Sequence, residues 1–298
     1  MSQEGRTRIS RRRLLKWGAG GGVAVWAQAR VGMFSRSASA ALSRPFVAIQ
    51  GTSSGEGGWT LRQDGLLNDY GDAFPFGPLP RPSSGEPYLD LQRTPTGLGL
   101  WALTKAGEIV ALGDATPFQS PTPTPISRES FVGIVSTPSG GGVWTLTKAG
   151  EIFAFGDASA FETPHPTPIS REPFHDLAAT PTGNGLWLLN RVGDVLAFGD
   201  ATPFESPDPT PISRSPFVGL EATISGEGLW MLTKSGAVLS FGDAEPFESP
   251  HPNPPGKTVF TDLARTPTGQ GLWLLTAAEN VLAFGDAQPF KKGPKGPQ

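Results

Sequence analysis

The chain has 298 residues, with no cysteine, 39 glycines, 31 prolines and a formal net charge of −3 at pH 7. The absence of cysteine excludes disulfides and a cysteine-linked lipid anchor. The glycine and proline content argues against helical repeats, because both residues destabilise helix interiors.

The first residues resemble a twin-arginine export signal. Residues 10 to 16 read Ser-Arg-Arg-Arg-Leu-Leu-Lys, so Arg11 and Arg12 stand as the paired arginines, and Leu14 replaces the Phe that is usual there. Proteins that use this route are folded before export, so the resemblance implies a bacterial-type exported protein with a periplasmic, cell-surface or extracellular destination.

An apolar, Gly-rich stretch of 13 residues follows from Trp17 to Ala29, and it is too short to span a bilayer. Ala38 and Ala40 give a small-residue cleavage site, so we expect a signal segment over residues 1 to 40. Whether it is cleaved or retained as an anchor stays open. Residues 1 to 40 hold eight Lys or Arg and one Glu, so the rest carries 16 basic and 26 acidic residues, a net charge of −10. That surplus argues against nucleic acid or an anionic membrane as partner.

A tandem repeat occupies most of the remaining chain. Six tryptophans are spaced by 42 residues once and by 43 residues four times: Trp59, Trp101, Trp144, Trp187, Trp230 and Trp273. An aspartate within Gly-Asp-Ala lies 13 residues after each one: Asp72, Asp114, Asp157, Asp200, Asp243 and Asp286. A period longer than a hairpin and shorter than a domain is typical of solenoids and propellers.

Each unit has the alternating pattern of short strands bounded by turn residues. In the third unit, residues 131 to 136, 143 to 147 and 151 to 156 predict three antiparallel strands, and residues 158 to 161 a short fourth at the outer edge. Such units predict an all-β, six-bladed β-propeller built from six repeats of about 43 residues, a single domain over residues 41 to 290.

The repeated residues have structural roles in this fold. Tryptophans within apolar strands are expected in the core between blades, although sugar-binding propellers use repeated tryptophans as exposed stacking platforms. The aspartates of Gly-Asp-Ala are expected to accept backbone N–H groups in the turn after the third strand. Both expectations assign the repeated residues a role in the stability of the fold.

The repeat also resembles a known family. Residues 271 to 276 read Gly-Leu-Trp-Leu-Leu-Thr, and residues 281 to 287 read Val-Leu-Ala-Phe-Gly-Asp-Ala. They are similar to the repeats of secreted actinobacterial proteins, which resemble NHL-like or kelch-like propeller blades. The resemblance implies fold and extracellular location, and it transfers no catalytic residue.

Alternate units differ at one position. Eleven residues before the Trp, the even units carry Asp90, Asp176 and Asp262, and the odd units carry Ala48, Gly133 and Gly219. First strands line the channel of a propeller, so these aspartates predict a three-fold carboxylate ring near the axis. We expect them to bind neighbouring backbone N–H groups; the alternative is a metal site holding Ca²⁺, the only cofactor that the sequence suggests.

The sequence leaves two interpretations of the Pro-rich loops between units. These loops carry different residues at matching positions: Thr122, His165, Asp208 and His251. The variation indicates either a rigid binding surface or neutral sequence drift in exposed loops. Ring closure requires residues 41 to 44 or the chain from Lys291, which begins a basic Pro/Gly tail over residues 291 to 298.

The sixth unit has one irregular turn. Glu279 replaces the glycine that the other five units carry, which predicts a looser turn with Asn280 at positive φ.

The function that follows is a non-enzymatic, exported binding or scaffolding module, expected to be a monomer that binds a protein or a cell-wall glycan. Six near-copies of one surface do not supply the asymmetric constellation that catalysis needs. The competing hypotheses are a carbohydrate-binding propeller with exposed tryptophans, and a secreted hydrolase or lyase with unique acids and bases at the channel mouth.

Overall fold

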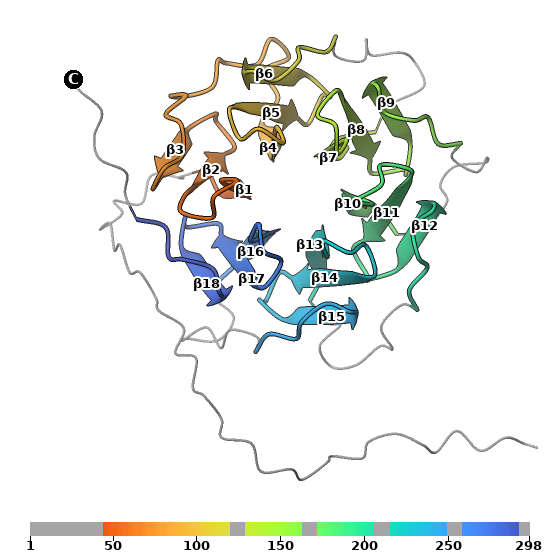
Figure 1. Cartoon of the computed structure of the whole chain (residues 1–298). Helices are drawn as coiled ribbons and strands as arrows, with labels where there is room; N and C mark the ends of the chain where they lie inside the picture. Colours follow the sequence, from red (N-terminus) through yellow and green to blue (C-terminus); the bar gives the residue numbers. More distant parts are fainter. Residues whose placement is uncertain (1–43, 120–128, 163–171, 206–214, 249–257, 292–298) are drawn as a thin grey trace, which may run out of the picture.

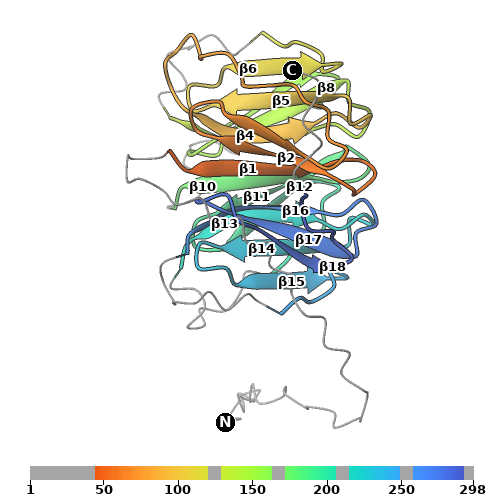
Figure 2. The ribbon, with the colours of Figure 1, turned by 90° about the vertical axis from the view of Figure 1, so that its left-hand side faces the viewer.

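The computed structural model describes residues 44–119, 129–162, 172–205, 215–248 and 258–291. In these ranges, 18 strands form six antiparallel sheets of three strands each, arranged around a central opening (Figure 1). Edge-on, the strands run from one face of the ring to the other (Figure 2). The predicted six-bladed, all-β propeller is confirmed.

Each blade contributes one strand to each of three concentric layers. The innermost strands are β1 (Phe46–Gly51), β4 (Tyr88–Arg93), β7 (Phe131–Ser136), β10 (Phe174–Ala179), β13 (Phe217–Ala222) and β16 (Phe260–Arg265). The middle strands are β2 (Gly58–Arg62), β5 (Gly99–Thr104), β8 (Gly142–Thr147), β11 (Gly185–Asn190), β14 (Gly228–Thr233) and β17 (Gly271–Thr276). The outer strands are β3 (Leu67–Tyr70), β6 (Ile109–Gly113), β9 (Ile152–Gly156), β12 (Val195–Gly199), β15 (Val238–Gly242) and β18 (Val281–Gly285).

The hydrophobic core lies between blades. The repeated tryptophans sit at the centre of the middle strands and are at most 1% exposed. Trp144 packs in one cluster with Phe174 and Leu186 of the next blade, and Trp273 packs with Phe46 and Ile49 across the junction of the chain ends. Each indole N–H donates to a backbone carbonyl 15 residues on, at 2.7–2.8 Å. The tryptophans are therefore core residues, as predicted, and their buried rings offer no stacking platform for a sugar.

The repeated aspartates make contacts that differ from the prediction. In the fourth blade, Asp200 accepts hydrogen bonds from the hydroxyls of Thr180 at 2.9 Å and Thr182 at 2.5 Å, rather than from backbone N–H groups. Thr180 Oγ1 in turn accepts the N–H of Gly185 at 3.0 Å. The same clasp recurs in all six blades, with Ser or Thr as the second hydroxyl. It joins the turn after the first strand to the turn after the third, and we call the face on which these turns lie the Asp face.

The predicted fourth strand is absent from the described residues. Residues 158 to 161 form no ladder, because the chain leaves its own blade and crosses to the next one. Phe161 contacts Phe198 of the following outer strand at 6.4 Å between ring centroids, as well as Trp144 of its own blade at 6.1 Å. The segment thus covers the next sheet instead of extending its own.

Ring closure repeats the contacts of the other blade junctions. The N–H of Phe46 donates to the Ala277 carbonyl at 3.1 Å, equivalent to the bond from Phe174 to Lys148 at 3.0 Å. The end of the chain also reaches the first blade: Phe290 stacks on Tyr70 at 5.3 Å, and the Lys291 carbonyl accepts the N–H of Gly71 at 2.8 Å. The two ends join without exchanging a strand.

The turn at Glu279 is not looser, and Asn280 does not take positive φ. Glu279 itself adopts φ +68°, the only described non-glycine residue to do so. Its carboxylate accepts hydrogen bonds from the Tyr70 hydroxyl at 2.7 Å and from the Asn68 amide, both on the first blade. The left-handed conformation costs about 1 kcal/mol, and these bonds across the closing junction offset it.

Several predicted features lie outside the described residues. They are the signal residues Arg11, Arg12, Ala38 and Ala40, the loop residues Thr122, His165, Asp208 and His251, and the tail from residue 292. The described ranges contain no helix long and apolar enough to cross a membrane.

Replacing Glu279 should weaken the closing junction. We expect Glu279→Ala to lower the free energy of unfolding by about 1–3 kcal/mol, since Asn68 and Tyr70 lose a partly buried acceptor and the strained backbone remains. Glu279→Gly should cost less, because glycine relieves the strain. Urea unfolding checks both, and equal stability of Glu279→Ala and the parent chain would contradict the assigned role.

Candidate functional site in the central channel

The innermost strands bring the three alternating aspartates into the channel. Asp90 accepts the N–H of Leu91 at 2.7 Å through Oδ1, and that of Ile134 on the next blade at 2.7 Å through Oδ2. Asp176 and Asp262 make the same pairs of bonds, to Leu177 and Leu220 and to Leu263 and Ile49. Each even blade is thereby tied to the odd blade that follows it, as the sequence predicts.

The small residues of the odd blades make room for this ring. A Cβ atom on Gly133 would lie 2.6 Å from Leu177 Cδ2, 3.3 Å from Asp176 Oδ1 and 3.6 Å from Asp90 Oδ2. The alternation of aspartate with glycine or alanine therefore reflects space in the channel.

Burial dominates the electrostatics of the ring. It raises the pKa of Asp90 to about 7, against the lowering effect of the two N–H donors. Burial, and then repulsion from Asp90, raises the pKa of Asp176 and of Asp262 well above the usual range, and Asp176 adds to the repulsion on Asp262. The ring holds protons at pH values where exposed aspartates are ionised.

The geometry of the ring supplies no free set of ligands for a metal ion. Both oxygens of each ring carboxylate already accept a backbone N–H. Across the described ranges, no group of three or more His, Cys, Asp or Glu side chains is arranged to hold a metal ion. Hydrogen bonding across blades is confirmed, and the Ca²⁺ site stays a prediction.

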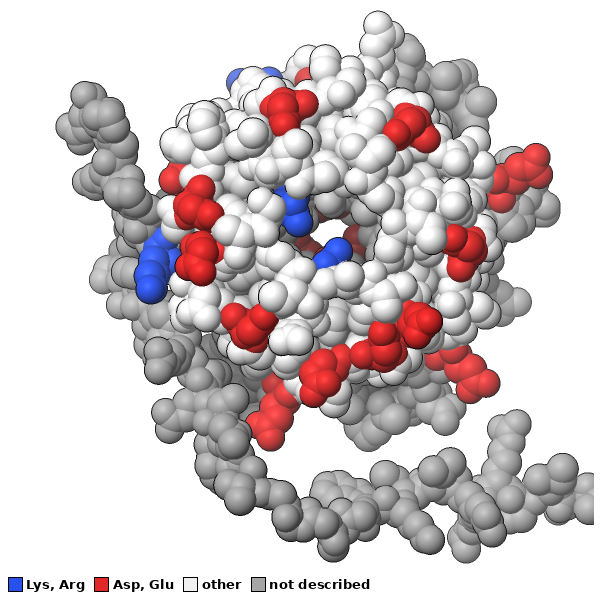
Figure 3. All heavy atoms as spheres, viewed as in Figure 1, with Lys and Arg blue, Asp and Glu red and all other residues white. Residues whose placement is uncertain are grey.

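At the end of the channel that opens on the Asp face, the residues of the innermost strands differ from one blade to the next. Among the innermost strands, Arg93 and Arg265 are the only Lys or Arg residues and Glu221 is the only glutamate. Arg265 Nε lies 3.0 Å from Glu221 Oε1. Figure 3 shows Lys or Arg side chains on two sides of the central opening, inside a wider circle of acidic side chains. We call the group of Arg93, Glu221 and Arg265 the mouth trio.

The trio follows from a fixed offset between neighbouring innermost strands. The fifth residue of one strand meets the sixth residue of the next: Glu221 contacts Arg265, and Gln92 Nε2 donates to Ser136 Oγ at 3.3 Å. Sequence reasoning missed these residues. The signal that finds them is a departure from the repeat at the last two positions of the first strand.

Toward the opposite end of the channel lies the one histidine of the innermost strands, His175, with the cations Lys148 and Arg191 nearby. His175 occupies a bulge in β10, and its Nδ1 is buried without a hydrogen-bond partner among the described residues. Burial, and then Arg191 and Lys148, lower the pKa of His175 to about 4, so the imidazole is neutral at pH 7. His175 therefore contributes a neutral packed ring, and no charge, to this end of the channel.

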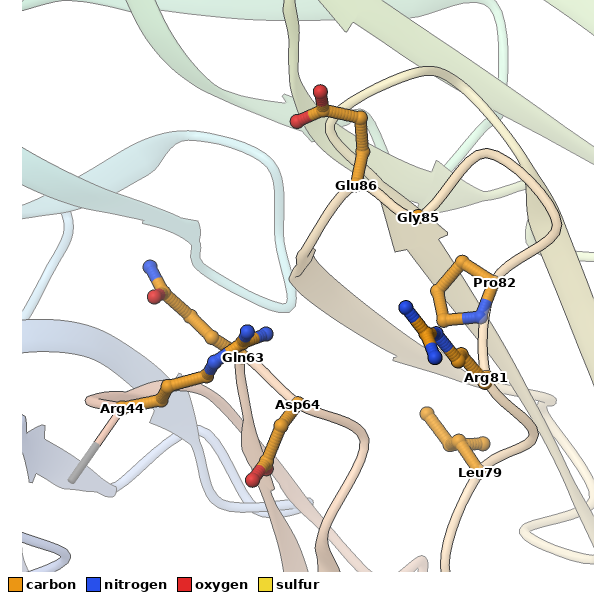
Figure 4. A pocket seen from close by; sticks show the side chains of 8 residues that line it. All are labelled: Arg44, Gln63, Asp64, Leu79, Arg81, Pro82, Gly85 and Glu86. Atoms are coloured by element: carbon orange, nitrogen blue, oxygen red, sulfur yellow. The ribbon is translucent and has the colours of Figure 1, made fainter. Parts of the chain in front are cut away.

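A cavity of about 410 Å³ lies beside the first blade, near residues 79 to 86 (Figure 4). The guanidinium groups of Arg44 and Arg81 extend toward each other across it, and the carboxylate of Glu86 points away. Asp64 on its wall forms an ion pair with Arg62 at 2.8 Å. The long side chains that line this cavity are mostly exposed, so its walls are less fixed than those of the channel mouth.

Comparison with known proteins supports the fold alone. No known protein family and no curated protein matches this chain in sequence. Among solved structures, it is similar to the β-propeller domain of Cps50 (Swd1) from Myceliophteria thermophila, with a TM-score of 0.52 and 11% sequence identity. The match covers 82% of this chain and 97% of that one.

The ring predicts a pH-dependent stability. Its carboxyl groups have folded pKa values above the unfolded value of 3.8, so the stabilisation from proton uptake is complete below that value and is lost as pH rises through the folded pKa, about 7 for Asp90. We expect the free energy of unfolding to fall by about 1–3 kcal/mol between pH 6.5 and 9. His175 titrates below this window.

Urea unfolding at a series of pH values measures this slope. Asp90→Asn removes one charge from the ring and should flatten the slope, whereas the exposed control Glu86→Gln should leave it unchanged. A slope that survives Asp90→Asn would show that the ring is not its source.

Proposed function

We propose that this chain is an exported, non-enzymatic β-propeller that binds a ligand at the channel mouth on its Asp face. It would act as a binding or scaffolding module at the cell surface or outside the cell. The observation that carries the proposal is the position of the charged residues that do not recur in every blade. The repeated polar residues hold blades and turns together, whereas arginine ends only two of the six innermost strands, at Arg93 and Arg265, and glutamate stands only at Glu221; all three gather at the mouth.

The two competing hypotheses find less support. Sugar stacking on the repeated tryptophans is blocked by their burial. A hydrolase needs an acid and a base that reach one substrate atom. Glu221 is paired with Arg265, and His175 stands three positions earlier in its strand, about 10 Å along the channel. The described residues thus bring no acid–base pair together at the mouth.

Export depends on the paired arginines in this proposal. We expect Arg11→Lys combined with Arg12→Lys to retain the protein in the cytoplasm, because the twin-arginine motif tolerates loss of both guanidinium groups poorly. Arg6→Lys with Arg8→Lys preserves the same charge outside the motif and is the matched control. Cell fractionation followed by immunoblotting gives the readout, and normal export of the first variant would contradict the route.

Ligand binding is tested by thermal melts of the full chain with a panel of cell-wall glycans and peptides, and with Ca²⁺ or chelator. We expect at least one glycan or peptide to raise the Tm, because a ligand that binds only the folded state stabilises it. The shift should disappear in Glu221→Gln/Arg265→Gln and persist in Lys148→Gln, which changes the other face. A shift that is unaffected by the mouth variant would place the site elsewhere.

A further inference from the structure

One guanidinium in the mouth, that of Arg93, forms no ion pair among the described residues. The offset that joins Glu221 to Arg265 and Gln92 to Ser136 makes Gln50 the equivalent neighbour of Arg93 across the first junction. An amide therefore stands where the fifth junction has a carboxylate. The Arg93 guanidinium donates from Nη1 to the Thr94 carbonyl, and at 3.4 Å this hydrogen bond is long.

The surroundings of Arg93 favour an anion beside its guanidinium. Its side chain is partly buried, and burial, followed by repulsion from Arg265, lowers its pKa. Glu221 acts in the opposite direction, but its carboxylate is shared with Arg265. A partly desolvated cation without a partnered carboxylate is costly, and an added anion would relieve that cost.

The mouth also has room for such an anion. Around the rest of the circle, the two positions that end the innermost strands carry no other ionisable side chain that would compete for the anion. The opening between the basic side chains is visible from this face (Figure 3). Two cations and one carboxylate leave one uncompensated positive charge, which matches a monoanion.

We propose that the mouth binds a ligand carboxylate, with Arg93 as the principal anchor and Arg265, held by Glu221, as the second contact. This inference rests on the proposed function and names the chemical class of its ligand. A planar guanidinium binds a carboxylate through two parallel hydrogen bonds, which gives both affinity and orientation. The carboxylate can belong to an acidic sugar or to the end of a peptide, and the experiment separates these sources.

The test measures binding to the full chain by isothermal titration calorimetry with two matched pairs of probes. One pair is glucuronate and glucose, and the other is an acetylated dipeptide with a free or an amidated carboxyl end. We expect a carboxylate member of at least one pair to bind about ten-fold or more tightly than its neutral partner, with affinity that falls as salt increases. Which pair discriminates identifies the source.

Two substitutions localise the binding. Arg93→Gln removes the anchor and should reduce carboxylate affinity about ten-fold. Gln50→Glu keeps Arg93 but supplies an internal carboxylate in the position that Glu221 occupies for Arg265, and should reduce affinity similarly by competition. Thermal melts confirm that both variants fold, and Lys148→Gln on the opposite face should bind as the parent chain does.

The outcomes separate this inference from the proposed function. Carboxylate affinity that is unchanged in both Arg93→Gln and Gln50→Glu, or no preference for the carboxylate member of either pair, would overturn the inference. If a neutral probe then binds and loses affinity in Glu221→Gln/Arg265→Gln, the mouth is still a binding site and the proposed function stands. If mouth variants change the binding of no probe, both fall.

Discussion

The apolar contact between neighbouring blades is the interaction on which the rest of this structure depends. The middle strands of five blades are buried along all six residues, so a single sheet in water would expose both of its faces. Each cluster of the core combines a Trp of one blade with strand residues of the next. No blade can bury this surface alone, which is why the same residues recur six times and why the chain ends meet through contacts like those elsewhere.

Polar bonds then fix how the packed blades are oriented. The clasp of Asp200 is internal to a blade, whereas the ring aspartate Asp176 reaches across to the next blade. A carboxylate in every blade would not fit, because the space at Gly133 is already taken by Leu177 and two aspartates. The structural unit near the axis is consequently a pair of blades, which gives a physical reason for the alternation in the sequence. The cost is a set of partly buried carboxylates that resist ionisation.

Features of the sequence that depend on local pattern were predictable, and those that depend on position in space were not. Alternation and turn residues placed the strand at Phe131–Ser136 correctly, and the spacing of the tryptophans gave the number of blades. The fourth strand was wrong because Phe161 packs on another blade, which no pattern within one repeat reveals. The bonding partners of the Gly-Asp-Ala aspartates lie 18 and 20 residues away and become neighbours only when the sheet forms. Glu279 takes a glycine conformation because of residues on the first blade.

The mouth trio escaped prediction for a reason that also explains its chemistry. Comparing repeats emphasises what the blades share, and what they share is used to build the ring. The last two positions of each innermost strand are less uniform than the core: they hold arginine, glutamate, glutamine, serine, valine, alanine and glycine in different blades. Some of these residues, such as Ala178 and Gly51, pack into the inter-blade core, whereas the charged ones lie at the mouth. A closed ring can therefore carry different charges at the mouth positions that stay outside its core. Arg93 forms no ion pair among the described residues and has no evident role in stability, which is the physical basis for assigning it to a ligand.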